Sequence, residues 1–395
     1  MPHVVLEAAD RPGGVIRSER VGGRVLERGP QRARLTARLA ALVDELGLRD
    51  QLHLAPPGRP LYVYADGKLR RVPFSPGELL RTDLLSWPAK VRLALEPLTG
   101  APRPEERVAD LFARKFGRQA YERMAGPLYG GLYASNPADM VVGLSLGHVL
   151  KEFGVRRSFL LTLLGRGGTV APPRACSFTE GLQALTDALY ERNRGTVRLG
   201  APVRRLAPSQ GAWSIELGGE AIGVERVVIT CPARAAAAIL EAAAPGAADR
   251  FRRLRYNPLA VVHLHAESGL RGLGYQVALS EDLATLGVTW NDALFGRDGV
   301  HTAYLGGAKN PDVVEQPDDR LGDIAAREFE RVTGRSARPL AVAREAMPAW
   351  DASWAALEGL ALPPGVTIAA NWESRPGIQG RLDQARRLAA GIKAQ

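Results

Sequence analysis

The stretch Val4-Val5-Leu6-Glu7-Ala8-Ala9-Asp10-Arg11-Pro12-Gly13-Gly14 carries most of the information about the fold. Three apolar residues run into a carboxylate and then into a turn rich in charge and glycine. This pattern is typical of a buried parallel strand that leaves its sheet at a polar C-terminal tip. Because ligands of open α/β sheets bind outside the carboxyl ends of the strands, the stretch predicts a ligand site at this tip.

The residue types in the turn indicate a nucleotide. An acidic residue that closes such a strand accepts hydrogen bonds from ribose hydroxyls, and Glu7 stands at that place. Gly13 and Gly14 would let backbone N–H groups approach a ligand closely. Arg11 and Arg17 would supply fixed positive charge for a pyrophosphate. The alternative is a surface hairpin turn after an edge strand.

The pattern resembles the second nucleotide-contact motif of FAD-dependent oxidoreductases of the amine oxidase and protoporphyrinogen oxidase superfamily. There, a first strand and a G-x-G-x-x-G turn precede this motif by about 25–30 residues. This sequence reads Met1-Pro2-His3 directly before the motif and has no G-x-G-x-x-G further on. We therefore expect a gap at the middle strand of the parallel sheet, whether the start of the sequence is misplaced or the protein is a truncated relative.

Composition places the chain among ordinary globular proteins. Its 395 residues are 46% hydrophobic and 24% charged, which favours two or three domains. Cys176 and Cys231 lie far apart without C-x-x-C spacing, so neither a disulfide framework nor a zinc site is expected. The sequence contains no secretory leader pattern and no run of about 18 apolar residues. We expect a cytoplasmic protein with, at most, peripheral contact with the inner face of the cell membrane.

The charge favours anionic partners. The formal net charge is +10 and the pI is near 9.9, which suits acidic lipid, nucleic acid or a small polycarboxylate. The arginines are scattered, and no basic tail or aromatic-interleaved basic stripe occurs, so nucleic-acid binding is not expected. Residues 75–168 have a helical pattern with much apolar surface beside basic residues, which fits either a lipid-facing amphipathic surface or an ordinary helical core.

The remaining chain predicts a mixed α/β fold. Residues 61–72 read as a hairpin around Asp66-Gly67. Strands and helices alternate again after Cys176. Four antiparallel strand candidates lie within residues 258–347, at 259–264, 275–279, 303–305 and 340–344. A last strand at 366–372 precedes a helix over about 379–389.

Several blocks together narrow the resemblance to protoporphyrinogen oxidase, including its coproporphyrinogen-oxidising bacterial form. They include Glu27-Arg28-Gly29-Pro30, residues 79–97, residues 126–134, residues 178–189 and Tyr304-Leu305-Gly306-Gly307. The resemblance implies an FAD-binding domain of the p-hydroxybenzoate-hydroxylase type, a substrate domain on an antiparallel sheet, and a helical membrane-associated domain. The expected boundaries are, in that order, 1–56 with 170–250 and 362–395; 57–74 with 251–361; and 75–169.

The implied reaction is the oxygen-dependent oxidation of protoporphyrinogen IX or coproporphyrinogen III in haem biosynthesis, with hydride transfer to FAD. Oxygen is the implied electron acceptor, and a homodimer is left open. Monoamine oxidases and phytoene desaturases share the nucleotide motif, so another flavoenzyme of this kind is an alternative. An inactive flavoprotein that binds porphyrin is a further one.

The resemblance assigns residues to the cofactor and the substrate, and it names no general base. The residues assigned to FAD are Glu7, Arg11, Gly13, Gly14, Arg17, Gly29, Val203, Gly377, Ile378 and Gln379. The residues assigned to the substrate are Gln31, Arg32 and Arg34. The sequence departs from the family's pattern at two places, which predicts weaker activity. Gly380 stands about where the family has an Asp, and Pro348-Ala349-Trp350 replaces an expected Pro-x-Tyr.

Two other patterns could carry chemistry. Gly143-Leu144-Ser145-Leu146-Gly147 formally matches the G-x-S-x-G nucleophile elbow of hydrolases, with His148 beside it. A triad histidine should be distant in sequence, and this block sits among helices, so hydrolysis is disfavoured. His263 and His265 alternate along one expected strand face, but two ligands without a third make a poor metal site, and we expect no metal.

Overall fold

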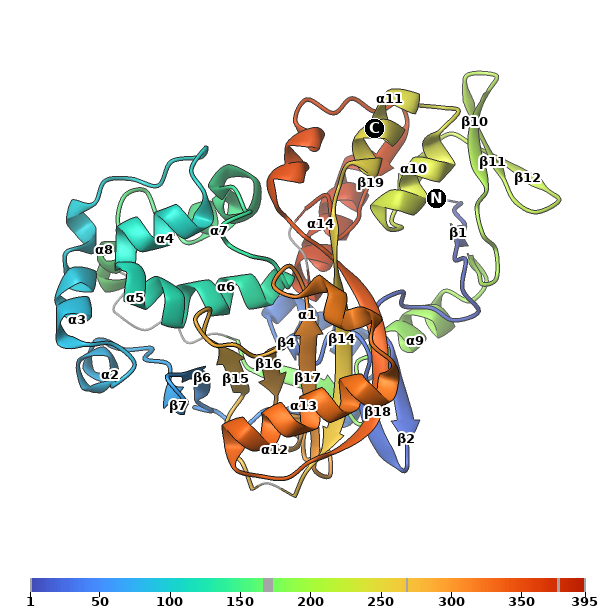
Figure 1. Cartoon of the computed structure of the whole chain (residues 1–395). Helices are drawn as coiled ribbons and strands as arrows, with labels where there is room; N and C mark the ends of the chain where they lie inside the picture. Colours follow the sequence, from blue (N-terminus) through green and yellow to red (C-terminus); the bar gives the residue numbers. More distant parts are fainter. Residues whose placement is uncertain (1, 166–172, 268, 375–376, 394–395) are drawn as a thin grey trace.

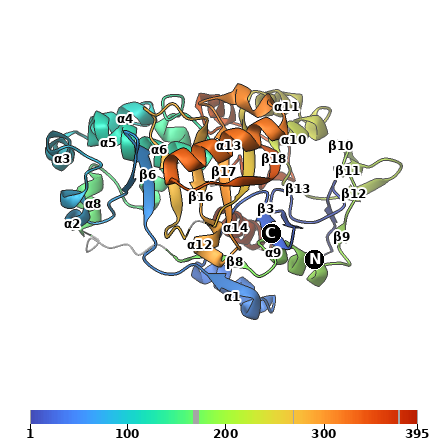
Figure 2. The ribbon, with the colours of Figure 1, turned by 60° about the horizontal axis from the view of Figure 1, so that its bottom comes forward.

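The computed structural model describes residues 2–165, 173–267, 269–374 and 377–393. It has the mixed α/β fold that the sequence predicts (Figure 1). A large sheet occupies the middle, and a block of helices lies at one end. Strands β10, β11 and β12 extend at the opposite end (Figures 1 and 2).

The large sheet has seven strands in the order β18-β14-β17-β16-β15-β6-β7. Its strands are β6 (Leu61–Ala65), β7 (Lys68–Arg71), β14 (Tyr256–His265), β15 (Gly274–Val277), β16 (Thr285–Thr289), β17 (Val300–Gly306) and β18 (Arg338–Pro348). All neighbours are antiparallel except β15 and β6. The β6–β7 hairpin turns at Asp66 and Gly67 with φ of 47° and 70°, which confirms the predicted primed turn.

Helix α13 (Asp318–Thr333) covers one face of this sheet (Figure 1). Its Leu321, Ala325 and Phe329 are at most 1% exposed and pack in one core with the strands. Because side chains alternate along a strand, β14 points Ala260 and Val262 into that core and turns the residues between them to the opposite face. On this opposite face, Leu259, Val261 and Ala343 pack in a smaller core with Ala134.

The parallel strands form two separate pairs. In the described part of the chain, β1 (Val5–Leu6) pairs with β9 (Val197–Arg198) alone, and β13 (Val227–Ile229) pairs with β19 (Val366–Ile368) alone. Within the described residues no further strand joins the two pairs. Val5 and Val228 are 48% and 42% exposed, whereas parallel strands are normally covered on both faces.

Further elements surround these pairs. The strands are β2 (Ser18–Val21), β3 (Arg24–Glu27), β4 (Ala33–Arg34), β5 (Leu52–Leu54), β8 (Ala175–Phe178), β10 (Arg205–Ser209), β11 (Ala212–Glu216) and β12 (Ala221–Val224). The helices are α1 (Ala37–Glu45), α9 (Gln183–Arg192), α10 (Ala233–Leu240), α11 (Pro245–Arg252), α12 (Asn291–Phe295) and α14 (Ile378–Lys393). Helix α1 begins where the Thr36 hydroxyl accepts a hydrogen bond from the Leu39 N–H at 3.3 Å.

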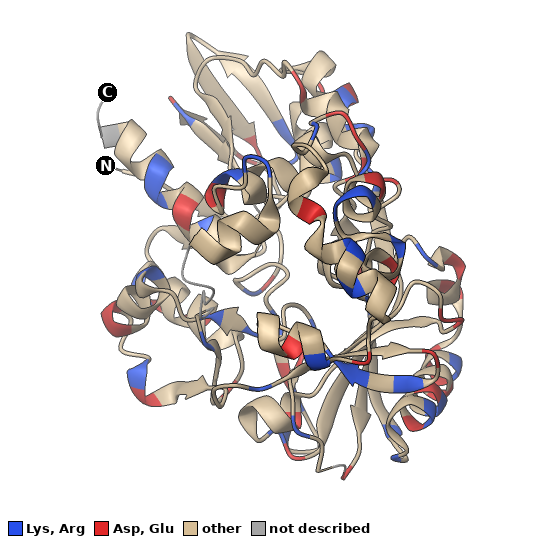
Figure 3. Ribbon diagram, turned by 90° about the vertical axis from the view of Figure 1, so that its left-hand side faces the viewer, with Lys and Arg blue, Asp and Glu red and all other residues tan. Residues whose placement is uncertain are grey.

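The helical block confirms the periodicity read from residues 75–165, and the expected boundary between residues 169 and 170 lies outside the described residues. Its elements are α2 (Pro76–Arg81), α3 (Trp87–Ala94), η2 (Glu96–Leu98), α4 (Val108–Phe116), α5 (Arg118–Ala120), η3 (Tyr121–Ala125), α6 (Gly126–Tyr133), η4 (Val142–Leu146), α7 (Gly147–Glu152) and α8 (Phe159–Gly165). No helix in the described part of the chain is long and apolar enough to cross a membrane. Basic residues (blue) and acidic residues (red) alternate along the ribbon without separating into two regions (Figure 3).

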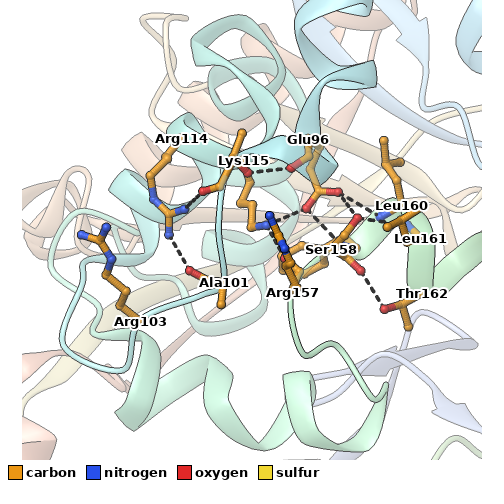
Figure 4. A network of polar contacts seen from close by, with 12 residues as sticks. Glu96, Ala101, Arg103, Arg114, Lys115, Arg157, Ser158, Leu160, Leu161 and Thr162 are labelled. Carbon is orange, nitrogen blue, oxygen red and sulfur yellow. Dashed lines mark hydrogen bonds and ion pairs between the residues drawn. The ribbon is translucent and has the colours of Figure 1, made fainter.

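A buried ion pair fastens this block together (Figure 4). The Lys115 Nζ lies 2.9 Å from Glu96 Oε1, and both side chains are fully buried. The Ser158 hydroxyl and the N–H groups of Phe159 and Leu160 also donate to the Glu96 carboxylate. Burial by itself would raise the pKa of Glu96, but the donors from Ser158 and Lys115 hold it below its ordinary value. The pair thus ties η2 and α4 to the start of α8.

Candidate flavin and substrate site

The carboxyl ends of three parallel strands meet at one edge. Glu7 follows β1, and Cys231 follows β13. Burial raises the pKa of the Cys231 thiol to about 11. Leu6 of β1 packs against the core that holds Ile229 of β13 and Ile368 of β19, so the three strands belong to one core. Trp372, which follows β19, donates from Nε1 to the Cys231 carbonyl at 2.9 Å. The strand ends therefore converge despite the gap between the pairs, as a ligand site of an α/β sheet requires.

Glu7 is held by its own turn. Its backbone N–H donates to the Arg198 carbonyl at 2.9 Å, which continues the β1–β9 pairing. Its Oε1 accepts from the Ala9 N–H at 2.8 Å, while Oε2 has no hydrogen bond within the described residues. One carboxylate oxygen is thus fixed by the protein and the other is available to a ligand.

The two glycines differ in surroundings. Gly13 has a φ of 103°, and a Cβ there would lie 2.7 Å from the Thr186 hydroxyl oxygen of α9. The missing side chain of Gly13 therefore lets the turn pack closely against helix α9. Gly14 has a φ of 56°, and a Cβ there would meet no atom within 4 Å. Gly14 is therefore the residue of the pair whose backbone faces open space.

The two arginines of the motif also differ. The Arg11 guanidinium donates to the carbonyls of Pro12, Gly14 and Ile16 at 3.1, 2.7 and 3.0 Å, so it closes the turn on itself. The side chain of Arg17 is 51% exposed, and its nearest carboxylate oxygen, on Glu19, is 3.9 Å away. Arg17 is the freer of the two cations.

Gly29 marks a place where two segments cross. A Cβ at Gly29 would lie 1.8 Å from the Val15 carbonyl oxygen, so no other residue fits there without moving the backbone. The turn of Glu27 to Gln31 is thereby pressed against the nucleotide motif.

A buried carboxylate lies under this turn. Glu27 is 4% exposed and accepts from the Ser18 hydroxyl at 2.6 Å and from the Leu182 N–H at 2.8 Å. Burial raises its pKa above the ordinary value, although these donors and the nearby Arg297 oppose the shift. Arg297 itself donates to the carbonyls of Phe178 and Thr179 at 2.6 and 2.8 Å. Glu27 thus connects the motif hairpin to α9 and to the large sheet.

Gln31 has its amide fully engaged. Its Nε2 donates to the carbonyls of Glu27 and Gly29 at 2.7 and 3.0 Å. Its Oε1 accepts from Asn291 Nδ2 and Thr302 Oγ1, both at 2.8 Å. Gln31 therefore fastens the turn to α12 and β17, and contact with a substrate stays a prediction.

Arg32 and Arg34 lie beside this anchored turn. Arg34 ends β4 and is exposed. Arg32 is half-buried. Burial lowers the pKa of the Arg32 guanidinium, and burial raises the pKa of Tyr304 to about 12. The hydrogen bond from Thr302 to the neighbouring Gln31 places this part of the turn beside β17.

The last predicted segment lies where α14 begins. Gly377 is exposed with a φ of 88°, and Ile378 packs in the core formed by α1 and α9. Gln379 accepts a hydrogen bond from the Thr36 hydroxyl and donates to Asp383 at 2.7 Å, so its amide joins α14 to α1. Val203 is partly buried just before β10. Flavin contact by these residues stays a prediction.

Neither rival pattern forms a site. Ser145 is fully buried within η4, and its hydroxyl donates to the Val141 carbonyl at 2.8 Å, so it does not stand on a strand-to-helix elbow. His263 Nε2 lies 2.9 Å from the Glu27 carbonyl, while His265 Nε2 lies 3.3 Å from Arg24. Among the described residues there is no cluster of three or more His, Cys, Asp or Glu that could hold a metal. Cys176 and Cys231 are both free.

Comparison with known proteins identifies the family. Residues 2–381 match the flavin containing amine oxidoreductase family. The chain belongs to this family. It is 28% identical over 369 residues to protoporphyrinogen oxidase 1, chloroplastic, of Spinacia oleracea, a match that covers 83% of this chain and 66% of that protein. It is 26% identical over 417 residues to coproporphyrinogen III oxidase of Mycobacterium leprae, covering 99% of this chain and 92% of that protein.

A solved structure shares the fold. The crystal structure of a protein from Exiguobacterium sp. 255-15, provisionally assigned as a protoporphyrinogen oxidase, superposes with a TM-score of 0.79. The match covers 99% of this chain and 92% of that chain at 21% identity, so it bears on the fold alone. Family membership makes this protein a flavin-dependent oxidoreductase.

Proposed function

We propose that this chain binds FAD and oxidises a porphyrinogen, protoporphyrinogen IX or coproporphyrinogen III, with oxygen as electron acceptor. The observation that carries the proposal is the segment after β1, in which Glu7 keeps one carboxylate oxygen free, Gly14 has open space around it and Arg17 is 51% exposed. The names of the spinach and mycobacterial relatives supply the substrate class.

The residues at the strand ends fit an adenosine diphosphate in donor and acceptor type. The free Oε2 of Glu7 would accept a ribose hydroxyl, and the open backbone at Gly14 with the exposed Arg17 would face the pyrophosphate. Arg11 would act indirectly, because its guanidinium holds the turn in shape. When bound, the flavin supplies the hydride acceptor for the reaction.

The face of the large sheet opposite α13 would contact the substrate. Its side chains are apolar and aromatic. Leu286, Tyr304 and Met347 are partly exposed there, beside the buried Leu259, Val261 and Ala343. Burial lowers the pKa of His263 to about 4, which keeps this neighbour neutral and makes it a poor proton acceptor. Proton loss from the substrate is therefore assigned to solvent.

An oxidase assay tests the function. The purified chain is incubated with FAD, and chemically reduced protoporphyrinogen IX and coproporphyrinogen III are added separately while porphyrin fluorescence, oxygen uptake and peroxide are recorded. We expect fluorescence to rise with matched uptake of oxygen and release of peroxide, faster than in protein-free buffer. Rates no faster than buffer with bound FAD present would contradict the assignment.

The divided parallel sheet favours one alternative, a porphyrin-binding protein without turnover. Such a protein would bind porphyrin tightly while the oxidase assay stays at the buffer rate. Porphyrin binding and turnover are therefore measured on the same preparation.

We further propose a cytoplasmic protein that rests on the inner face of the cell membrane through its helical block. Helices α2, α3 and α8 lie together at one end of the molecule (Figures 1 and 2). Their region exposes large apolar side chains. These are Phe74, Leu80, Trp87, Val91, Leu95, Leu98, Leu161 and Leu164, each at least 47% exposed. Lys90 lies 4.7 Å from the Trp87 ring, and this pairing of an aromatic with a cation suits an anionic lipid surface.

A further inference from the structure

Three of the six tryptophans of the chain, Trp350, Trp354 and Trp372, lie together in one buried core. Trp372 follows β19, whereas Trp350 and Trp354 lie just before and within the short helix η6 (Ala352–Leu357). All three side chains are at most 5% exposed. Indole and phenol rings are the aromatic side chains that give up a single electron most readily. A row of indoles in contact can therefore carry an electron as well as fill a core.

Direct contacts join the three indoles in a row. The rings of Trp350 and Trp354 are stacked, with their centroids 5.4 Å apart and an angle of 23° between their planes. Trp354 Nε1 donates to the Trp372 carbonyl at 2.8 Å. Trp372 Nε1 in turn donates to the Cys231 carbonyl at 2.9 Å, beyond the carboxyl end of β13. Because electron transfer slows steeply with distance, contacts of this kind make each step short.

The other end of the row reaches the helical block. The Trp350 ring centroid lies 6.4 Å from that of Tyr133, which ends α6. It lies 6.5 Å from the ring centroid of His148 in α7. The row therefore runs from the carboxyl ends of the parallel strands to the border of the helical block.

The position of Trp350 is held at a cost in free energy. Its φ is 50°, in the left-handed region that bulky residues rarely adopt. Its indole N–H is buried without a hydrogen-bond partner in the described part of the chain, although buried tryptophans usually find one. The gain from this arrangement is the stacking on Trp354 and the contact with Tyr133. Because strained residues of this kind gather at functional sites, the placement of the ring indicates a role besides packing.

We propose that Trp372, Trp354 and Trp350 form a path for single electrons, leading from the border of the helical block to a one-electron oxidant at the strand ends, such as a photoexcited flavin. The oxidant gains one electron from Trp372, which regains it from Trp354, which regains it from Trp350. The net products are the oxidant reduced by one electron and a radical cation on Trp350. This radical keeps its N–H proton, because no acceptor in the described chain is hydrogen-bonded to it.

The path goes beyond the proposed function, because hydride transfer moves electrons in pairs and uses none of the three indoles. It would draw single oxidising equivalents away from the cofactor site. Ordinary core packing needs the aromatic rings but not their oxidation, so a change from tryptophan to phenylalanine separates the two roles.

A photo-oxidant attached to Cys231 tests the path without flavin. Cys231 is partly exposed and Cys176 is fully buried, so a ruthenium polypyridyl iodoacetamide should label Cys231, next to Trp372. Labelling is done at alkaline pH, because burial raises the pKa of the Cys231 thiol to about 11. After a laser flash with an external quencher, transient absorbance follows the oxidised ruthenium and any indole radical.

The wild type is compared with Trp354→Phe, Trp350→Phe and the control Trp213→Phe. Trp213 is 8% exposed in the same core, but its Nε1 donates to the Pro364 carbonyl, before the start of β19 and away from the row. Circular dichroism checks that each labelled variant is folded. Trp350→Phe carries the test if Trp354→Phe does not fold.

We expect a long-lived indole radical cation in the wild type and in Trp213→Phe. Trp354→Phe should lose this signal, because phenylalanine keeps a ring in the core but does not pass the electron on. Trp350→Phe should also lose it, because the radical then stays nearer the ruthenium and recombines sooner.

Two results would overturn the inference. One is the absence of an indole radical in the labelled wild type. The other is an equal radical lifetime in the wild type and in folded Trp350→Phe, which would leave the three indoles with packing alone.

A second experiment on unlabelled protein, with FAD excited by light, separates this inference from the proposed function. A chain that refuses FAD but conducts from the ruthenium would overturn the proposed function and leave the path standing. Bound FAD whose excitation produces no indole radical would overturn a path that begins at the cofactor.

Discussion

The seven-stranded sheet and the parallel strands of the nucleotide-binding part are built to different degrees of completeness. In the first, ladders run without interruption from β18 to β7 and α13 seals one face with fully buried side chains. In the second, β1–β9 and β13–β19 stand as isolated pairs with exposed valines. The seven-stranded sheet with α13, here called the wall, is continuous and rigid. The parallel strands are divided into two pairs, and their polar carboxyl ends are not all flanked by further strands of the described chain. We therefore expect stability to depend on the wall and ligand affinity on the strand ends.

The largest expected effect comes from the wall. Phe329→Ala removes a fully buried ring that lies 5.1 Å from the His301 ring, and it should lower the free energy of unfolding by about 3–5 kcal/mol. Val228→Ala, at a 42% exposed site in β13, should change it by less than about 0.5 kcal/mol. Urea denaturation followed by circular dichroism measures both. Equal losses for the two variants would remove the distinction between the regions.

The next effect depends on pH at the junction between the wall and the Glu27 turn. Burial lowers the pKa of His263 and of His301 to about 4, below the ordinary value of about 6.5. Between these values the unfolded chain binds more protons than the folded one, so stability falls as the pH drops from about 6.5 to 4, by up to about 1.4 kcal/mol per unit for each group.

His263→Gln should reduce the loss of unfolding free energy with falling pH by up to about 1.4 kcal/mol per pH unit, because one group that takes up a proton on unfolding is removed. The measurement is urea denaturation of wild type and variant at several pH values from 7 to 4. A variant that loses stability with acid as steeply as the wild type would show that His263 is protonated when folded.

A smaller effect is expected at the divided sheet. Glu7→Ala should weaken FAD binding about 10- to 100-fold, since a carboxylate that accepts a ribose hydroxyl contributes about 1.5–3 kcal/mol. Asp10→Ala, an exposed carboxylate in the same turn, serves as the matched control and should bind as the wild type does. Flavin fluorescence quenching gives both affinities. An equal loss in the two variants would mean that general charge, rather than Glu7, governs affinity.

The smallest effect on stability is expected at the exposed helices. Replacing Trp87 and Leu98, 66% and 76% exposed, by serine should change the free energy of unfolding by no more than about 0.5 kcal/mol each. The same double variant should sediment less with vesicles that contain anionic phosphatidylglycerol. Undiminished sedimentation would contradict a membrane role for this surface.

Some elements could be predicted from the sequence because their signals are local. The turn signal Asp66-Gly67, flanked by strand-like segments, predicted the β6–β7 hairpin. The apolar run before Glu7 predicted β1. Helix α13 was missed, although Leu321, Ala325, Phe329 and Val332 follow helical spacing. Strand β16 was missed because its Thr285–Thr289 segment is short and holds a glycine, so long-range pairing rather than local pattern specifies it.

The site was predictable in its residues but not in their partners. Gly13 and Arg11 carry the motif's chemistry, yet the first packs against Thr186 and the second closes its own turn. Such partners come from segments far away in sequence, which a local pattern does not reveal. The buried Glu27 was quoted within a turn and not as a site residue, and its only sequence signal is a carboxylate that ends the apolar strand β3.

A parallel titration of the purified chain with FAD and with FMN tests the central claim most directly, because FMN lacks the adenosine that Glu7 is proposed to hold. We predict that FAD binds at least about 100-fold more tightly than FMN, a difference of about 2.7 kcal/mol. Equal affinities, or no binding of FAD, would contradict the claim that the ends of the parallel strands hold a dinucleotide.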